Sequence, residues 1–322
     1  MKISRPVRIA VQVTVSVAVL AFLLWQIDVS RTIDLIRSSN GLDLLAAYAI
    51  FLSTTWGMAW RWQMLLASKG IHEPLSWLTK LYFMGYAAGQ VLPTSVGGDA
   101  VRIAAHARRR PDVKGEAAGA VLMERLLGSA GTLVLVAVGL VLAIGRYDNI
   151  RVLIWIEIAF VVGLATLAVL MFSRRTNAWL QELGGTRRLA RGFRSVWSAL
   201  HGYRDKPGVL ILVLAVTVGL QFARIIAIWL CGEAVGLDLS PLVYVVMGPL
   251  LFLVMMVPFT INGLGVREAF FIAFLGRFGV SADAAFATGF LFYAVTVATS
   301  IPGGVLMLWQ SVRAPAARQP TV

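Results

Sequence analysis

Eight ionisable side chains stand within or beside long apolar runs of this 322-residue sequence. Four are arginines and four are carboxylates: Asp99, Arg102, Glu124, Arg125, Glu157, Arg224, Arg267 and Glu268. A charge near the centre of a bilayer costs at least about 2.5–3.5 kcal/mol, so such groups usually pair or line a polar cavity. One interpretation is a set of buried ion pairs that holds the local structure in place. The other is a cavity that receives an anion, because the planar guanidinium of arginine holds phosphate in two-point contacts.

Two glycine-rich segments carry several of these charges and resemble one another at an offset of 165 residues. Aligned without a gap, they share Pro, Gly, Val and Arg. Glycine and asparagine tolerate left-handed backbone, and glycine-rich turns let N–H groups and helix ends approach an anion. The candidate turn residues are Pro93, Gly97, Gly98, Pro258, Asn262, Gly263 and Gly265. The candidate substrate-binding residues are Arg102, Arg267, Asp99, Glu124, Arg125, Arg224 and Glu268.

Glu124 and Arg125 are adjacent in an otherwise apolar run, so their side chains point about 100° apart on a helix. We therefore expect each to meet a different partner, with Arg102 and Asp99 as the candidates. Arg224 needs a partner as well. The three histidines His72, His106 and His201 have no ligand spacing and are predicted to be loop or interface residues, so no metal or cofactor is expected.

The overall composition indicates the solvent around these charges. The chain is 58% hydrophobic and 14% charged, with a net charge of +13, whereas soluble domains are about 25% charged. A disordered chain is excluded, and neither a soluble enzyme nor a nucleic-acid binder fits. The single Cys231 excludes an internal disulfide framework. A very apolar and basic chain is typical of a multi-pass membrane protein whose positive charges lie in one set of loops.

Six apolar runs are long enough to span a bilayer, which takes about 20 residues. They are Val7–Ile27, Leu42–Trp60, Ala117–Ile144, Val152–Phe172, Val209–Leu230 and Ala284–Trp309. The first run is long and lacks a small-x-small cleavage site, so a retained anchor fits better than a cleaved signal peptide. Most of the 29 basic residues flank these runs on one side, Arg61 and Lys114 among them, which places both termini in the cytoplasm.

This orientation requires that two interrupted apolar segments, 75–105 and 241–278, enter and leave on the same side. We therefore predict two re-entrant hairpins, which are tolerated where their backbone is buried in protein or lines a wet cavity. Ordinary kinked spans are the alternative. The fold prediction is an all-α integral membrane protein with about six transmembrane helices and two re-entrant helical hairpins.

The halves 1–150 and 151–322 would each hold three spans and a hairpin. Since three crossings is an odd number, the second half would be inverted relative to the first, as in many secondary transporters. Chance similarity is the alternative, because Pro and Gly are common in membrane segments. The polar stretch 174–207 predicts a basic amphipathic helix, either a cytoplasmic topology anchor or a segment that recruits anionic lipid.

A family resemblance rests on a series of motifs spread over nearly the whole chain. These are Trp60-Arg61-Trp62, Leu65-Leu66, Pro93, Gly97-Gly98-Asp99, Arg102, Glu124-Arg125, and Asn262-Gly263-Leu264-Gly265-Val266-Arg267-Glu268. The sequence resembles the flippase-like transmembrane family that includes the membrane domain of lysylphosphatidylglycerol synthase. The resemblance implies an all-helical protein with re-entrant helices and a role in lipid translocation. The chain ends at Val322, which leaves no room for a synthase domain, so aminoacylated lipid is not the expected substrate.

The leading prediction is a flippase or transporter of an anionic or phosphate-bearing lipid in the cytoplasmic membrane of a bacterium. Arg102 and Arg267 would hold the phosphate alternately from the two sides. The partners would be membrane lipids and a lipid-biosynthesis enzyme, with no nucleic acid. An alternative is a subunit that presents lipid to a glycosyltransferase or hopanoid enzyme without transporting it. An intramembrane enzyme using Asp99 or Glu124 as base or nucleophile has no supporting motif, so the protein is not expected to be an enzyme.

Overall fold

The computed structural model describes residues 20–92, 97–143, 188–256 and 265–313, together with Gly263 and scattered positions within 14–17 and 155–173. All regular structure in these ranges is helical. Four of the described helices are long and apolar enough to cross a membrane: α3 (Gly41–Ala67), α6 (Lys114–Ala143), α10 (Pro207–Ala234) and α13 (Ala282–Arg313). They match four of the six predicted runs. The other two runs lie largely outside the described residues, and Glu157 lies outside them. The four apolar helices indicate an all-helical, multi-pass membrane protein.

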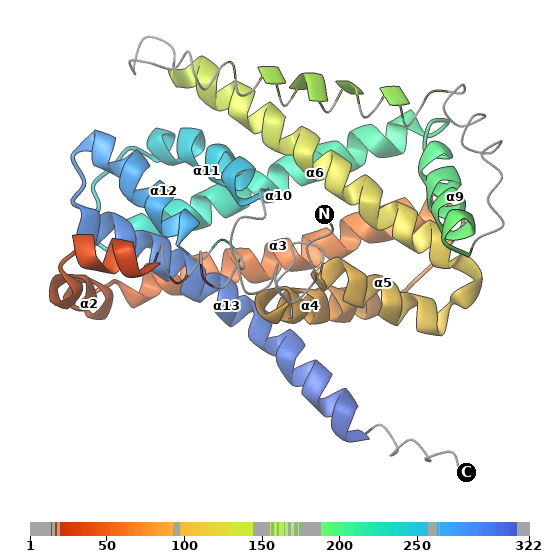
Figure 1. Ribbon diagram of the computed structural model, residues 1–322, viewed down its shortest axis with the longest axis horizontal. Helices are drawn as coiled ribbons and strands as arrows, with labels where there is room; N and C mark the ends of the chain where they lie inside the picture. The colour runs from red at the N-terminus through yellow and green to blue at the C-terminus, as the bar shows by residue number, and fades with distance from the viewer. Residues whose placement is uncertain are drawn as a thin grey trace.

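Helices α3 and α10 lie side by side and antiparallel in the middle of the molecule (Figure 1). Thr54 of α3 contacts Arg224, while Arg61, two turns further along, contacts Thr217. The contact nearer the C-terminus of α3 is therefore the contact nearer the N-terminus of α10, so the two helices run in opposite directions. Gly57 lets the helices approach, because a Cβ there would press on the Leu220 side chain.

Helices α4 (Leu75–Val91) and α5 (Gly97–Arg109) cover nearly all of the described part of the segment in which the first re-entrant hairpin is predicted. Gly85 faces Gly98, and a Cβ on Gly98 would lie 3.0 Å from the carbonyl carbon of Gly85. Nearer the open end, the Arg102 guanidinium lies 4.2 Å from the Tyr82 ring centroid. The two helices are therefore antiparallel. At 17 residues, α4 is about 25 Å long, which is short of the roughly 30 Å hydrocarbon core. Pro93 lies outside the described residues.

Helices α11 (Pro241–Met256) and α12 (Val266–Leu275) lie in the segment 241–278, where the second re-entrant hairpin is predicted. Gly263 and Gly265 have φ of 73° and 84°, so the left-handed backbone expected of this turn is present. Pro258 and Asn262 lie outside the described residues. Val246, Leu250 and Leu253 of α11 pack in one cluster with Phe270 and Phe274 of α12.

The helix contacts of the two halves correspond when 165 residues are added to the numbers of the first half. α4 packs on α13 and α11 on α6, while α3 packs on its own counterpart α10. The short helix α2 (Val29–Arg37) packs on α13, and α9 (Arg188–His201) packs on α6. The short 3-10 helices η1 (Pro111–Val113) and η3 (Gly276–Phe278) also lie 165 residues apart. Figure 1 shows α2 and α9 at opposite ends of the molecule, as expected if two similar halves are inverted.

Candidate functional site

A cavity of about 660 Å³ lies where α3, α4, α5, α6 and α10 meet. Single residues from α11 and α13, Phe252 and Thr296, complete its wall. The ionisable residues that line it with a carboxylate or guanidinium are Arg61, Asp99, Arg102, Glu124, Arg125 and Arg224. Four positive and two negative groups thus share one cavity, where charges interact more strongly than in water.

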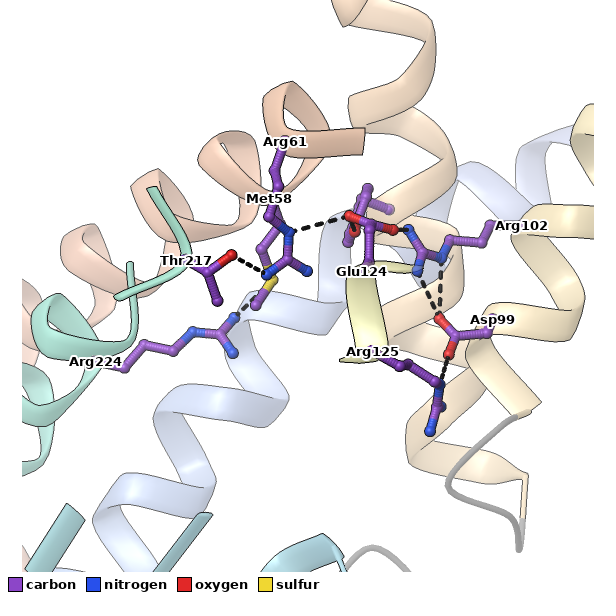
Figure 2. A network of polar contacts seen from close by, with 9 residues as sticks. Met58, Arg61, Asp99, Arg102, Glu124, Arg125, Thr217 and Arg224 are labelled. Atoms are coloured by element: carbon purple, nitrogen blue, oxygen red, sulfur yellow. Dashed lines mark hydrogen bonds and ion pairs between the residues drawn. The ribbon is translucent and has the colours of Figure 1, made fainter. Parts of the chain in front are cut away.

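Glu124 is the buried centre of this network, with a side-chain exposure of 1%. Its Oε1 atom accepts from Arg61 Nε at 3.2 Å and from the Tyr82 hydroxyl at 2.5 Å. Its Oε2 atom lies 2.8 Å from Arg102 Nη1. The Arg102 guanidinium also stacks on the Tyr82 ring, which holds it in place. Helices α3, α4, α5 and α6 are therefore joined through one carboxylate (Figure 2).

Asp99 continues the network toward the opening of the cavity. Its Oδ1 atom is 2.8 Å from Arg102 Nη2, and its Oδ2 atom accepts from Arg125 Nε at 2.5 Å. Side-chain exposure rises from 5% at Arg102 to 17% at Asp99 and 41% at Arg125. The prediction that Glu124 and Arg125 meet separate partners, Arg102 and Asp99, is confirmed (Figure 2).

Arg224 faces the same cavity from α10 but has neutral partners. Its Nε atom donates to Thr54 at 3.2 Å, and its Nη2 atom contacts Met58 Sδ at 3.3 Å and the Tyr86 hydroxyl. The guanidinium lies 5.0 Å from the Phe51 ring centroid. No carboxylate lies within 4 Å of it in the described ranges. Its positive charge is thus held by aromatic rings and hydroxyls.

Arg267 and Glu268 lie elsewhere, at the start of α12, and do not line this cavity. Arg267 Nη2 is 2.6 Å from Glu268 Oε1, and the guanidinium lies 4.4 Å from the Tyr293 ring centroid. Glu268 Oε2 accepts the N–H of Gly265 at 2.7 Å, so its carboxylate already occupies the helix end proposed for an anion. The structure brings together five of the seven predicted residues and leaves these two apart.

The sequence of the second half has no counterparts of Glu124 and Arg125. At the 165-residue offset, Glu124 and Arg125 correspond to Gly289 and Phe290. A Cβ on Gly289 would lie 3.1 Å from the Phe271 ring, so this position serves close helix packing. The asymmetry is readable in the sequence once the two halves are aligned.

Two predictions about single residues are wrong. Arg61 was expected among the cytoplasmic loop residues, but α3 continues to Ala67 and leaves Arg61 buried beside Glu124. His106 was expected in a loop or interface, but it is fully buried in α5. Tyr82 and Tyr86, one helical turn apart on α4, are two aromatic cavity residues that sequence reasoning also missed. Their spacing on an apolar helix was the available signal.

Glycines and uncharged polar residues form most of the rest of the wall. Gln221 donates to the Gly128 carbonyl at 2.9 Å and to Thr132 at 3.1 Å, which ties α10 to α6. Within the described ranges, no three His, Cys, Asp or Glu side chains are grouped as metal ligands would be.

The sequence was compared with known families and proteins. No curated protein matches it. A family model described as the lysylphosphatidylglycerol synthase TM region matches residues 9–303, which is most of the chain. This match agrees with the motifs around Asp99, Glu124 and Arg267, and the chain belongs to the family of the lysylphosphatidylglycerol synthase TM region.

Proposed function

We propose that the protein is a flippase, which moves an anionic or phosphate-bearing lipid across the cytoplasmic membrane. Its family relates it to lipid handling, and the match is to a membrane region, which fits a role without catalysis. The observation that carries the proposal is the cavity charge, four arginines against two carboxylates. An excess of positive charge in a cavity within a membrane protein is stabilised by an anion that balances it.

The positions of the two carboxylates indicate how the cavity would take a phosphate. Glu124 is almost wholly enclosed and holds Arg61 and Arg102 in place. Arg125, which is paired with Asp99, and Arg224, whose hydrogen-bond partners Thr54 and Tyr86 are neutral, both line the open volume. A lipid phosphate entering there would meet both guanidinium groups, which are suited to two-point contact with its oxygens. Arg102, Asp99 and Glu124 would form the wall behind it.

Transport by this site would use movement of one half of the molecule against the other. The matching helix contacts and the antiparallel pairing of α3 with α10 support two inverted halves, 1–150 and 151–322. Re-entrant α4–α5 and α11–α12 hairpins and cytoplasmic termini complete this proposal. Because the charge network lies in the first half and α10, we assign one anion site rather than two alternating ones. Arg267 and Glu268 would stabilise the second hairpin.

Reconstitution tests the function. Purified protein in liposomes should carry fluorescent phosphatidylglycerol from the inner to the outer leaflet, measured by quenching with an impermeant reductant. Phosphatidylcholine, which has no net charge, should move much less. Equal rates for protein-containing and protein-free vesicles with a range of anionic lipids would reject transport, and lipid binding without movement would favour the lipid-presenting alternative.

A further inference from the structure

A buried pair of titratable side chains lies outside the cavity, where α5 meets the turn between α3 and α4. The Nε2 atom of His106 is 3.5 Å from the Oε1 atom of Glu73, and the side chains are 0% and 3% exposed. Within the described part of the chain, neither ring nitrogen of His106 nor Glu73 Oε1 makes a hydrogen bond. The proposed transport site uses neither residue, so these unpartnered atoms need another explanation.

The pair has the chemistry of a site for one exchangeable proton. With one proton shared, the pair is neutral overall, whereas loss of it leaves a buried carboxylate and a second proton leaves a buried imidazolium. The charged groups around the pair are Arg109, Arg110 and Asp112, and Arg110 Nη1 lies 3.8 Å from Glu73 Oε1. These three groups lie at the end of α5 and in η1, and the side facing α3 is closed by an uncharged indole, that of Trp62.

The pair is physically connected to the cavity. Asp99, Arg102 and His106 are spaced three and four residues apart on α5, so they lie on one face of that helix. The Trp62 ring centroid lies 5.7 Å from the His106 ring and 4.9 Å from the Arg102 guanidinium carbon. A change of charge or position at His106 therefore reaches Arg102 through one turn of helix and one shared ring.

We propose that Glu73 and His106 bind a proton, and that its binding is coupled to anion binding in the cavity through α5 and Trp62. The coupling rests on the proposed function, whereas proton binding at the pair does not. By linkage, an anion in the cavity changes the proton affinity by the factor by which the proton changes the anion affinity. The protein would then respond to pH, or exchange a proton for lipid.

Proton binding is measurable directly because the chain has only three histidines. The full-length protein, labelled with ¹³C-histidine in detergent, would be titrated by NMR from pH 4 to 9. We expect the His106 resonance to titrate in this range and Glu73→Gln to lower its midpoint by about 1–3 pH units, since an opposite charge nearby favours imidazolium. The control His72→Gln changes an exposed neighbour of Glu73 and should leave the His106 midpoint unchanged.

Either of two results would overturn the proton site: a His106 resonance that does not titrate, or a midpoint that Glu73→Gln leaves in place. The assignment does not depend on a His106 variant that folds, because His72→Gln and His201→Gln identify the other two resonances. If the Glu73→Gln protein does not fold, the wild-type titration alone decides.

The coupling is tested by repeating the titration with short-chain phosphatidylglycerol, whose binding is followed by its ³¹P signal. We expect the His106 midpoint to move when this lipid is bound. A bound lipid with an unmoved midpoint would reject the coupling. Absence of any bound lipid would count against both the anion site and the coupling, while the first titration would still decide the proton site.

Discussion

The charged side chains of the cavity network differ in how deeply they are buried, and therefore in how much they contribute to stability. Glu124 is enclosed between two arginines and a tyrosine, so removal of its charge takes the paired carboxylate from Arg61 and leaves Arg102 with Asp99. Breaking a buried pair by removing one partner typically costs about 3–5 kcal/mol. Arg125 is 41% exposed, and an exposed pair contributes about 0–1 kcal/mol. The network therefore has an enclosed inner part around Glu124 and a more exposed outer part at Arg125.

The first prediction follows from this difference. Glu124→Gln should lower the free energy of unfolding in detergent by about 3–5 kcal/mol. The matched Arg125→Gln should lower it by about 1 kcal/mol or less. Denaturant titration followed by tryptophan fluorescence measures both. Equal destabilisation by the two changes would mean that the network is not divided in this way.

Most charged residues of this network could be predicted from the sequence, whereas the residues that pack around them could not. Asp99, Arg102, Glu124 and Arg125 stood out because charge is rare in apolar runs. Arg61 did not, because it follows an apolar run directly and an arginine there is typical of a loop anchor. Only the packing of α3 against α6 and α10 shows that the helix continues and that Arg61 is buried.

At the scale of helices, glycine contacts set how closely the site-bearing elements approach. Gly98 at the start of α5 touches the backbone of Gly85 in α4, which places Arg102 over the Tyr82 ring. Gly98 was expected to lie in a turn whose backbone approaches an anion, yet it lies within α5, has no positive φ, and packs against the backbone of Gly85. Gly263 and Gly265 do have positive φ. The sequence shows where a glycine lies, but it does not show whether that glycine serves close helix packing or a backbone with positive φ.

The second prediction concerns this contact. A Cβ at Gly98 would collide with Gly85 backbone atoms, which cannot rotate away, so Gly98→Ala should destabilise the protein by about 1–3 kcal/mol. The control Gly219→Ala adds a Cβ to α10 in open space and should be neutral or stabilising by up to about 1 kcal/mol. Thermal unfolding in detergent compares them. A stable Gly98→Ala protein would argue against close α4–α5 packing.

On the scale of the whole molecule, different short helices pack at its two ends. The Asn40 N–H donates to the Ala234 carbonyl, so the start of α3 lies against the end of α10, and the Asp28 N–H donates to Asp283, so the start of α2 lies against the start of α13. Helix α9 packs on the start of α6 at the opposite end (Figure 1). Four apolar spanning helices were predictable from the apolar runs, and the two re-entrant hairpins remain predictions. The helix contacts between halves were not predictable, since they depend on which faces meet.

The third prediction assigns these ends to the two sides of the membrane. Asp238→Cys and Ser281→Cys should react with an impermeant maleimide added to intact cells, and Lys114→Cys should react only after lysis. All three positions are exposed, and the native Cys231 is fully buried, so background labelling should be low. Lys114→Cys labelled in intact cells would refute the re-entrant α4–α5 hairpin.

The most direct test of the account is the rate of phosphatidylglycerol translocation in liposomes for two matched double variants. Arg125→Gln/Arg224→Gln removes two charges from the cavity, whereas Arg37→Gln/Arg277→Gln removes two exposed charges outside it. We predict a loss of at least about tenfold in the first variant, as expected for removal of about 1.4 kcal/mol or more of anion stabilisation, and a wild-type rate in the second. A folded cavity variant with the wild-type rate would contradict the claim that the lipid phosphate passes through this cavity.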